Sequence, residues 1–255
     1  MSIIALPNWL TAQPQNAVTI NTEFTKGLTW LTCPSVGHGN LAPGRIASSS
    51  VPKTRAITSG AGGLGYVYVN GSAGDNPTQS MAAFGATNRV TYFSVVYRTG
   101  TAANAGIIFD RGGLWGSTLG SDGASFGYYW SGSDNAYVTG LAPKLNAVSA
   151  MAHAISPAKV MFALDGKTNV RTNANATQTF LGTGTWLGTD NLSTIRTFPG
   201  RILMAGMVLG DSWSEGKLRS FSQNPWQIFS PPRQKKYWLP FVAAAPNTSR
   251  VMYIG

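Results

Sequence analysis

AKVMFALDGKTNV, residues 158–170, is the stretch that decides the fold. Large apolar residues recur at every second position from Val160 to Leu164, as in a strand that buries one face. Asp165 and Gly166 follow directly. An Asp-Gly pair is typical of a two-residue hairpin turn, because both central residues of that turn need a positive φ. The stretch therefore predicts a β-hairpin, with Asp165 and Gly166 as structural turn residues.

Further strand patterns extend outward from this hairpin. Runs of β-branched and aromatic residues, bounded by Gly, Asn and Ser, predict short strands joined by turns. These runs cover residues 64–71, 89–98, 105–110, 124–130, 146–155, 185–190 and 200–210. Asn70-Gly71 predicts a second hairpin turn. Both faces of 89–98 are largely apolar, which predicts a strand in the middle of a sandwich.

One helix is predicted, over residues 213–223. Ser212-Trp213-Ser214-Glu215 has the Ser-x-x-Glu pattern of a capping box, so Ser212 and Glu215 are the predicted capping residues. Pro225 ends the helix. Trp226, which comes next, is predicted to plug the end of the sandwich.

These elements predict an all-β protein, an antiparallel β-sandwich jelly roll with one short C-terminal helix, since no βαβ alternation is present. Residues 1–21 are predicted to form an extended N-terminal arm, because prolines interrupt them and they show no periodicity. The jelly-roll domain is expected to span 22–232. An extended basic and aromatic tail is expected over 233–255.

Composition narrows the class of protein. The chain has 255 residues, 30 glycines, only 11% charged residues and a net charge of +10. The basic excess reflects missing acids more than basic clusters, so we do not expect nucleic acid as a partner. Cys33 is the one cysteine, so an intrachain disulfide is excluded. We expect Cys33 to be a small, packed structural residue. Neither a signal peptide nor a membrane-spanning run is visible, so no membrane partner is expected.

Three stretches, in order, resemble one fold family: FTKGLTW (24–30), KVMFALDGKTN (159–169), and TFPGRILMAGMVLGDSWSEGKLRSFSQNPWQIFSPP (197–232). They are similar to the laminin G-like and concanavalin A-like lectin/glucanase jelly rolls, in the version found in bacteriophage and prophage structural proteins. The resemblance implies a concanavalin A-like sandwich, a place in a virion and assembly with other virion proteins, but its motifs concern the fold and do not fix an activity.

The acidic residues argue against an enzyme. Glycoside hydrolysis needs two carboxyl groups about 5–10 Å apart. Glu23 and Glu215 are the only glutamates, and no two acids stand at the i, i+2 spacing of one strand face. His38 and His153 are the only histidines, too few for a zinc site and without an evident triad. We therefore predict no catalytic residues and no bound metal.

Calcium is the one cofactor the resemblance leaves open, because laminin G-like domains sometimes hold it through loop oxygens. Asp122, Asp134 and Asp190 with Asn191 are the candidate ligands, although ordinary turns explain them as well. The glycine-rich run 59–67 does not indicate a nucleotide cofactor, because a strand and not a helix is predicted after it.

Aromatic residues near Gly, Ser and Asp turns are candidate carbohydrate contacts, since rings stack on the apolar faces of pyranoses. The candidates are Trp115, Tyr129 and Trp130, and core packing is the alternative for each. The tail carries a second candidate site, for assembly or docking on a neighbouring subunit or the virion surface. Its residues are Arg233, Lys235, Lys236, Tyr237, Trp238 and Phe241. An edge strand of the same molecule is the alternative for the tail.

The leading hypothesis is a non-enzymatic phage virion protein, a capsid decoration or tail component, localised in the virion as a homo-oligomer. One version of this hypothesis adds that the virion protein contacts glycan on the host surface. The alternative is a receptor-binding tail protein or a carbohydrate-binding module. A glycosidase-like enzyme is the third hypothesis, and the missing acid pair opposes it.

Overall fold

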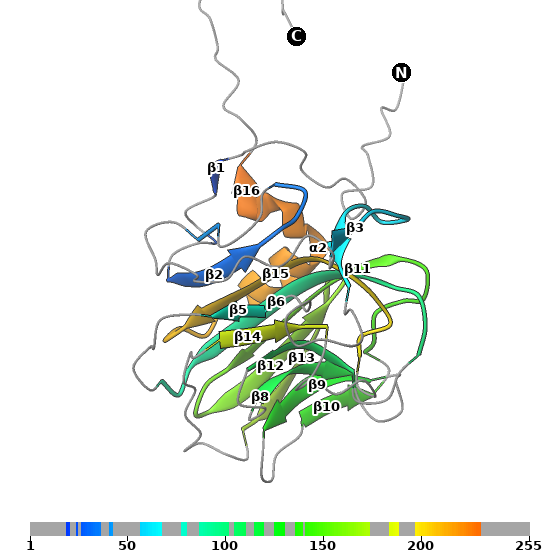
Figure 1. Cartoon of the computed structure of the whole chain (residues 1–255). Coiled ribbons are helices and arrows are strands. Elements are labelled where there is room, and N and C mark those ends of the chain that lie inside the picture. Colours follow the sequence, from blue (N-terminus) through cyan, green and yellow to red (C-terminus); the bar gives the residue numbers. More distant parts are fainter. Residues whose placement is uncertain are drawn as a thin grey trace, which may run out of the picture.

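The computed structural model contains two β-sheets packed face to face and a helical layer (Figure 1). The residues that the structure describes are 19–20, 24, 27–36, 41–42, 57–67, 78–80, 87–101, 105–110, 115–119, 125–130, 136–139, 141–173, 184–188 and 197–230. The predicted hairpin turn at Asn70-Gly71 and the predicted tail lie outside them.

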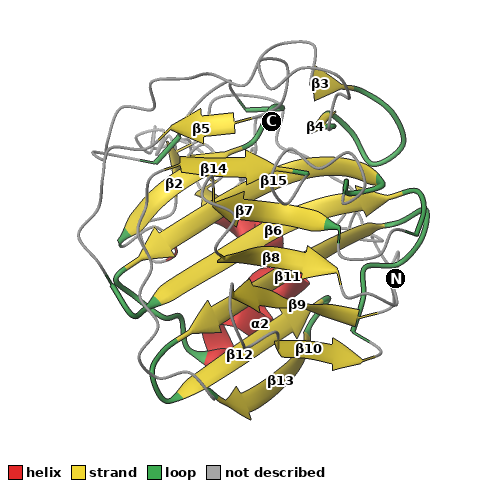
Figure 2. Cartoon of the chain, turned by 60° about the horizontal axis from the view of Figure 1, so that its bottom comes forward, coloured by secondary structure: helices red, strands yellow, loops and turns green. Residues whose placement is uncertain are grey.

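One sheet has six strands. Their order is β10 (Ala136–Thr139), β9 (Ser125–Trp130), β8 (Trp115–Leu119), β7 (Gly106–Asp110), β14 (Gly184–Leu187) and β5 (Thr78–Ser80). Every pairing within it is antiparallel. Figure 2 shows this sheet in front of the other one, with α2 on the far side.

The other sheet has eight strands. Their order is β13 (Lys167–Thr172), β12 (Lys159–Leu164), β11 (Val148–Ile155), β6 (Val90–Arg98), β15 (Gly200–Leu209), β4 (Gly65–Tyr66) and β3 (Ile57–Thr58), with β2 (Leu28–Thr32) also on β15. A separate pair joins β1 (Thr19–Ile20) to β16 (Phe229–Ser230). The predicted antiparallel β-sandwich jelly roll is confirmed.

The core between the sheets follows from strand alternation. Val160, Phe162 and Leu164 of β12 all lie in it, as the period-2 pattern predicts. On the neighbouring strand β11, Met151 and Ile155 face the same way. The inward residues of both sheets together bury one continuous apolar cluster, which is what holds the two sheets together.

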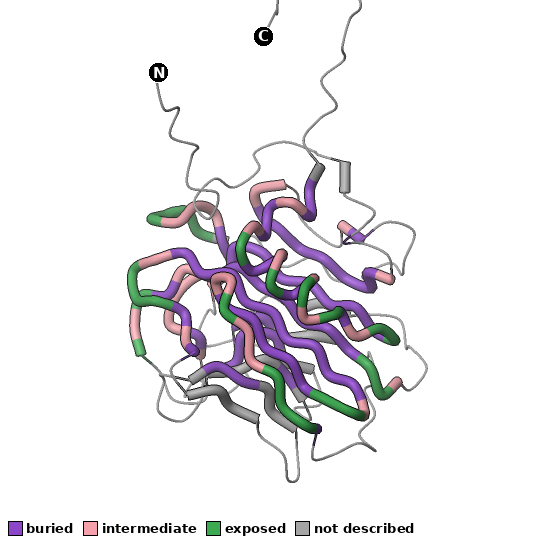
Figure 3. Tube along the Cα trace, turned by 180° about the vertical axis from the view of Figure 1, so that it is seen from behind, coloured by how far each residue is buried: buried purple, intermediate pink, exposed green. Residues whose placement is uncertain are grey.

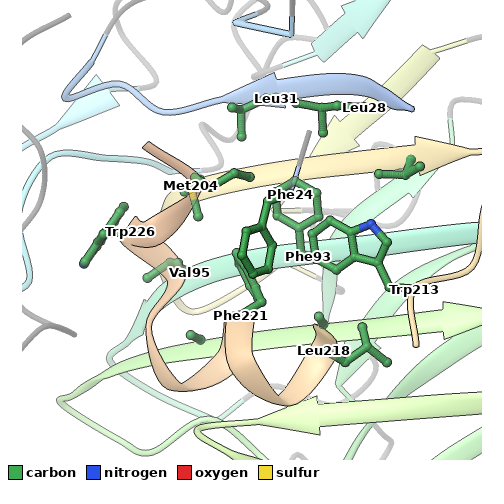
Figure 4. Close-up of a cluster of buried hydrophobic side chains, with 14 of the residues drawn as sticks. Phe24, Leu28, Leu31, Phe93, Val95, Met204, Trp213, Leu218, Phe221 and Trp226 are labelled. Atoms are coloured by element: carbon green, nitrogen blue, oxygen red, sulfur yellow. The ribbon is translucent and has the colours of Figure 1, made fainter. Parts of the chain in front are cut away.

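A second apolar cluster covers the outer face of the eight-stranded sheet. It lies beneath α2 (Glu215–Gln223) and the short 3-10 helix η2 (Pro225–Ile228), and Figure 4 shows several of its side chains. After Val148, the outward residues of β11 are Ala150, Ala152 and Ala154, whose small size lets α2 approach closely. This layer explains why β6 is apolar on both faces: one face meets the other sheet and the other face meets α2 (Figure 3).

The predicted hairpin is confirmed. Asp165 and Gly166 connect β12 to β13 with φ values of 47° and 84°, as this turn requires. The Asp165 carboxylate also accepts hydrogen bonds from the Ser149 hydroxyl at 3.0 Å and the Ala150 N–H at 2.8 Å. Gly166 donates its N–H to the Ser222 hydroxyl at 3.0 Å, which ties the turn to α2.

The predicted capping residues are wrong. The helix begins at Glu215, and its N-cap is Ser214, whose hydroxyl accepts the Lys217 N–H at 3.3 Å. Ser212 does not cap: Trp213 precedes the helix and donates its N–H to the Thr91 hydroxyl at 2.9 Å.

Glu215 is not a capping residue either. Its carboxylate accepts from the Thr168 hydroxyl at 2.6 Å and pairs with Arg219 at 3.1 Å. The side chain therefore links the first turn of the helix to strand β13 and to the next turn of the helix.

Trp226 lies in the outer layer and does not plug the end of the sandwich. Pro225 begins η2 directly after the helix ends at its C-cap, Asn224, so the predicted stop is confirmed. The Trp226 side chain is 7% exposed and belongs to the cluster beneath the helices. It packs there because η2 folds the chain back onto the eight-stranded sheet.

We expect Trp226→Ala to lower the free energy of unfolding by about 3 kcal/mol, since a large buried ring is lost and the cavity refills only in part. Denaturant unfolding followed by circular dichroism would measure the change. Trp226→Phe is the matched control and should lose much less. An unchanged midpoint in the alanine variant would mean that Trp226 is a surface residue.

Candidate functional site

The three candidate carbohydrate contacts lie on two adjacent strands of the six-stranded sheet. Trp115 on β8 is directly opposite Trp130 on β9, and Tyr129 is opposite Gly116. The backbone thus brings together residues that are well separated in sequence. Within the described part of the chain, no helix lies over the outer face of this sheet (Figure 2). By strand alternation Tyr129 is on this outer face, whereas Trp115 and Trp130 are on the inner face together with the core residue Phe126.

The described acidic side chains have structural partners. Asp165 and Glu215 are engaged as given above. The Asp211 carboxylate accepts the Ser212 N–H at 2.8 Å. Burial is the largest influence on Asp165 and raises the pKa of its carboxyl group, while the bonds from Ala150 and Ser149 lower it. None of these carboxylates is paired with a second one, as hydrolysis of a glycosidic bond would need.

Metal ligands do not gather among the described residues: no group of three or more His, Cys, Asp or Glu side chains lies close enough to hold an ion. The calcium candidates Asp122, Asp134, Asp190 and Asn191 lie outside the described residues, as do Glu23 and His38. Calcium binding by that set stays a prediction.

His153 is a core residue. It is fully buried between the sheets, with its ring centroid 4.9 Å from that of Tyr92, 5.7 Å from Phe126 and 6.0 Å from Phe162. Burial among these rings lowers the pKa of His153 to about 3. A neutral imidazole enclosed in this way has no access to a substrate and cannot act as a general base.

Cys33 is also buried, as predicted for a small packed residue. Burial raises the pKa of its thiol to about 11, although a contact with the Ser35 hydroxyl opposes the shift. The thiolate is the reactive form of cysteine, so this residue is inert as a nucleophile at neutral pH.

The glycine-rich run 59–67 forms turns that lead into strand β4, so the strand predicted there is confirmed. A side chain at Gly60 would overlap the Arg201 guanidinium, and one at Gly62 would overlap the Tyr97 ring. Arg201 donates to the Ala61 carbonyl and stacks 4.9 Å from the centre of the Tyr97 ring. These glycines therefore serve close packing.

The candidate docking residues of the tail, Arg233 to Phe241, lie outside the described residues. Among the described residues, no helix has the length and hydropathy needed to cross a bilayer. Sequence reasoning missed one exposed feature, the edge of the eight-stranded sheet at β13. Its signal was the change from an apolar run in 160–164 to polar residues in 167–172.

Comparison with known proteins finds similarity to this chain in fold and not in sequence. No protein-family model matches the chain, and no curated protein sequence is similar enough to match it. Domain 4 of a GH43 extracellular arabinanase from Geobacillus stearothermophilus, solved with arabinotriose, has a TM-score of 0.51 and 16% identity, covering 72% of this chain and 90% of that domain. Trypanosoma rangeli sialidase, solved with sialic acid, has a TM-score of 0.55 and 8% identity.

The sialidase match covers 88% of this chain but only 37% of the sialidase. A CBM40 domain of a Ruminococcus gnavus sialidase, solved with α2,3-sialyllactose, has a TM-score of 0.43 and 11% identity, covering 53% of this chain and 83% of that one. The matches to the arabinanase domain and the Trypanosoma rangeli sialidase show a shared β-sandwich jelly-roll fold.

Proposed function

We propose that this chain is a glycan-binding domain of the lectin-like type, without enzymatic activity. The observation that carries the proposal is the shared sandwich with the arabinanase domain, which the match covers over 90% of its length and which was solved with arabinotriose. Tyr129 supports it, because strand alternation puts this residue on the outer face of the six-stranded sheet, whereas Trp115 and Trp130 are on the same face as the core residue Phe126.

The role of Tyr129 would be to stack on the apolar face of a sugar ring, which needs area and rigidity more than charge. The absence of an enzymatic role rests on the carboxylates. Among the described side chains, Asp165, Asp211 and Glu215 each accept hydrogen bonds within the fold, and in the sequence no two acids stand at the i, i+2 spacing of one strand face.

A glycan array probed with the full chain tests the proposal. We expect binding to a defined set of glycans, and we expect Tyr129→Ala to weaken it about tenfold, a cost of ~1.4 kcal/mol that is ordinary for an aromatic contact. Leu145→Ala is the control, because it removes another exposed apolar side chain, 51% exposed, from a different part of the surface.

Two results would contradict the proposal. Binding to no glycan at any concentration would remove the glycan-binding role. Release of reducing ends from a bound polysaccharide, abolished by replacing one acidic residue, would make the chain an enzyme.

The finer role that we infer is that of a virion component of a phage. Residues 197–232 resemble those of phage structural jelly rolls, and the tail is rich in aromatic and basic residues. The pairing of β1 with β16 supports a shared attachment function for both flanking segments, because it joins the strands from which 1–18 and 231–255 continue.

Deleting residues 233–255 tests the attachment role. We expect a folded sandwich, because the buried core residues that the structure describes all lie between Phe24 and Phe229. The truncated protein should fail to join virions, as measured by co-sedimentation with particles. Normal attachment would place the docking contacts elsewhere, and an unfolded product would assign the tail to the core.

A further inference from the structure

Strand β13 (Lys167–Thr172) is the last strand of the eight-stranded sheet at that edge, and no strand of the described chain pairs beyond it. Most of its side chains are exposed. Val170 at its middle is 45% exposed, one of two large apolar side chains that the described surface leaves open. An edge strand of this length is a template for pairing with another strand unless something covers it.

One hydrogen bond shows which residues of β13 direct their backbone N–H and C=O groups toward β12 and which direct them toward the edge. Asn173 donates its N–H to the Ala158 carbonyl at 3.2 Å, so the residue after the strand is bonded toward β12. In an antiparallel pair, bonded and non-bonded positions alternate. Residues 167, 169 and 171 are therefore bonded toward β12, and Thr168, Val170 and Thr172 turn their N–H and C=O groups to the open edge.

The side chains of β13 separate in the same alternation. Lys167 and Arg171 are opposite Leu164 and Val160 of β12, so both cations lie on the face that looks toward the six-stranded sheet. The other face carries Thr168, Val170 and Thr172. The positions that turn their backbone to the edge thus hold no charge, and the cations do not block approach of a second strand.

We propose that two copies of this chain pair along β13, antiparallel and in one register, with Val170 opposite itself across a two-fold axis. This register sets Thr168 opposite Thr172 of the second copy. On the other face it sets Asn169 opposite Arg171. Valine and threonine pairs are favourable across strands, and the amide of Asn169 accepts from a guanidinium.

The neighbouring two-fold registers are excluded by charge. A shift toward the N-terminus puts Asn169 opposite itself and Lys167 opposite Arg171. A shift toward the C-terminus puts Arg171 opposite itself. Like charges directly across a strand pair are destabilising, so of these three registers only the one centred on Val170 avoids them.

A second copy fits this edge better than the chain's own tail. The tail segment begins with Arg233, Lys235 and Lys236, which would add positive charge next to Lys167 and Arg171. Its apolar part, 237–242, contains a proline, which cannot donate to a strand ladder.

Cysteine cross-linking of the full chain tests the register. Paired residues at a bonded position have Cα atoms about 5.5 Å apart, within the range a disulfide spans, so Val170→Cys should give a covalent dimer on mild oxidation. Asn169→Cys and Arg171→Cys are matched controls. In the proposed register each lies about 8 Å from its own copy, beyond disulfide reach. The native Cys33 is buried and should not react.

Sedimentation of the full chain gives an independent measurement. We expect a concentration-dependent dimer, and we expect Val170→Lys to weaken its association at least about tenfold, because two ammonium groups would meet at the axis. The melting temperature of the variant should stay close to that of the parent chain. A strictly monomeric parent, equal cross-linking at 169 or 171, or a dimer unaffected by Val170→Lys would each overturn the proposal.

Discussion

Trp213→Ala is expected to lower the free energy of unfolding by about 5 kcal/mol, at the top of the range for a buried tryptophan. The ring is 1% exposed and stacks on Phe93 with 5.1 Å between centroids and an interplanar angle of 11°. It also meets Phe24 edge-on at 5.8 Å and Phe221 of the helix at 5.8 Å. Its removal leaves a cavity where three segments meet, and no single segment can move to fill it.

Chemical denaturation with an unchanged m-value would measure this loss as a stability change alone. Trp213→Phe is the control, because it keeps an aromatic ring against Phe93 and should recover most of the stability. A loss below about 1 kcal/mol in the alanine variant would show that the layer repacks around the gap, contrary to the rigid cluster described above.

Acid is expected to destabilise the fold through His153. Its pKa is about 3 in the folded protein and 6.5 in the unfolded chain, so the unfolded chain binds the proton first as pH falls. The stability present above pH 6.5 is therefore lost between pH 6.5 and about 3. The slope reaches ~1.4 kcal/mol per pH unit, and the total is about 5 kcal/mol.

Replacing the imidazole by a non-titrating side chain isolates this effect. The unfolding free energy of His153→Leu should fall less steeply than that of the parent protein as the pH is lowered. The difference in unfolding free energy between the two proteins therefore changes with pH below 6.5. The carboxyl of Asp165, whose pKa is raised, acts in the opposite direction but is common to both proteins and cancels. Parallel pH profiles would mean that His153 is protonated in the folded state.

Local patterns made the strands and the hairpin predictable. The alternation at 160–164 depends only on which neighbours share a face, and the turn depends only on two residues that tolerate positive φ. Both signals lie within a few residues of the elements that they predict, so no knowledge of distant contacts was needed.

The outer layer could not be predicted in the same way. Ser212 and Ser214 both precede Glu215 at plausible capping positions, and the choice between them is made by Thr91, a residue of β6 far along the chain. Gly206 gives no local signal either, yet a side chain there would overlap the Phe93 ring that lies over it. Such choices depend on tertiary contacts.

The candidate site was predictable only in part. Sequence reasoning selected Trp115 and Trp130, and the register places them directly opposite each other. It predicted this strand as part of the hairpin but did not find that it is the edge of the sheet, because the hairpin pattern does not show whether another strand pairs beyond it. The calcium candidates remain a prediction from composition and turn chemistry.

The pairing of β2 with β15 has a consequence for synthesis of the protein. Strand β2 (residues 28–32) cannot pair with β15 until residues 200–209 have been synthesised. In the folded protein the Thr29 hydroxyl accepts a hydrogen bond from the Leu209 N–H at 3.0 Å. Contacts between such distant segments make folding slow. A nascent chain therefore carries this apolar strand without its β15 neighbour until β15 has left the ribosome, and apolar surface exposed in that interval favours aggregation.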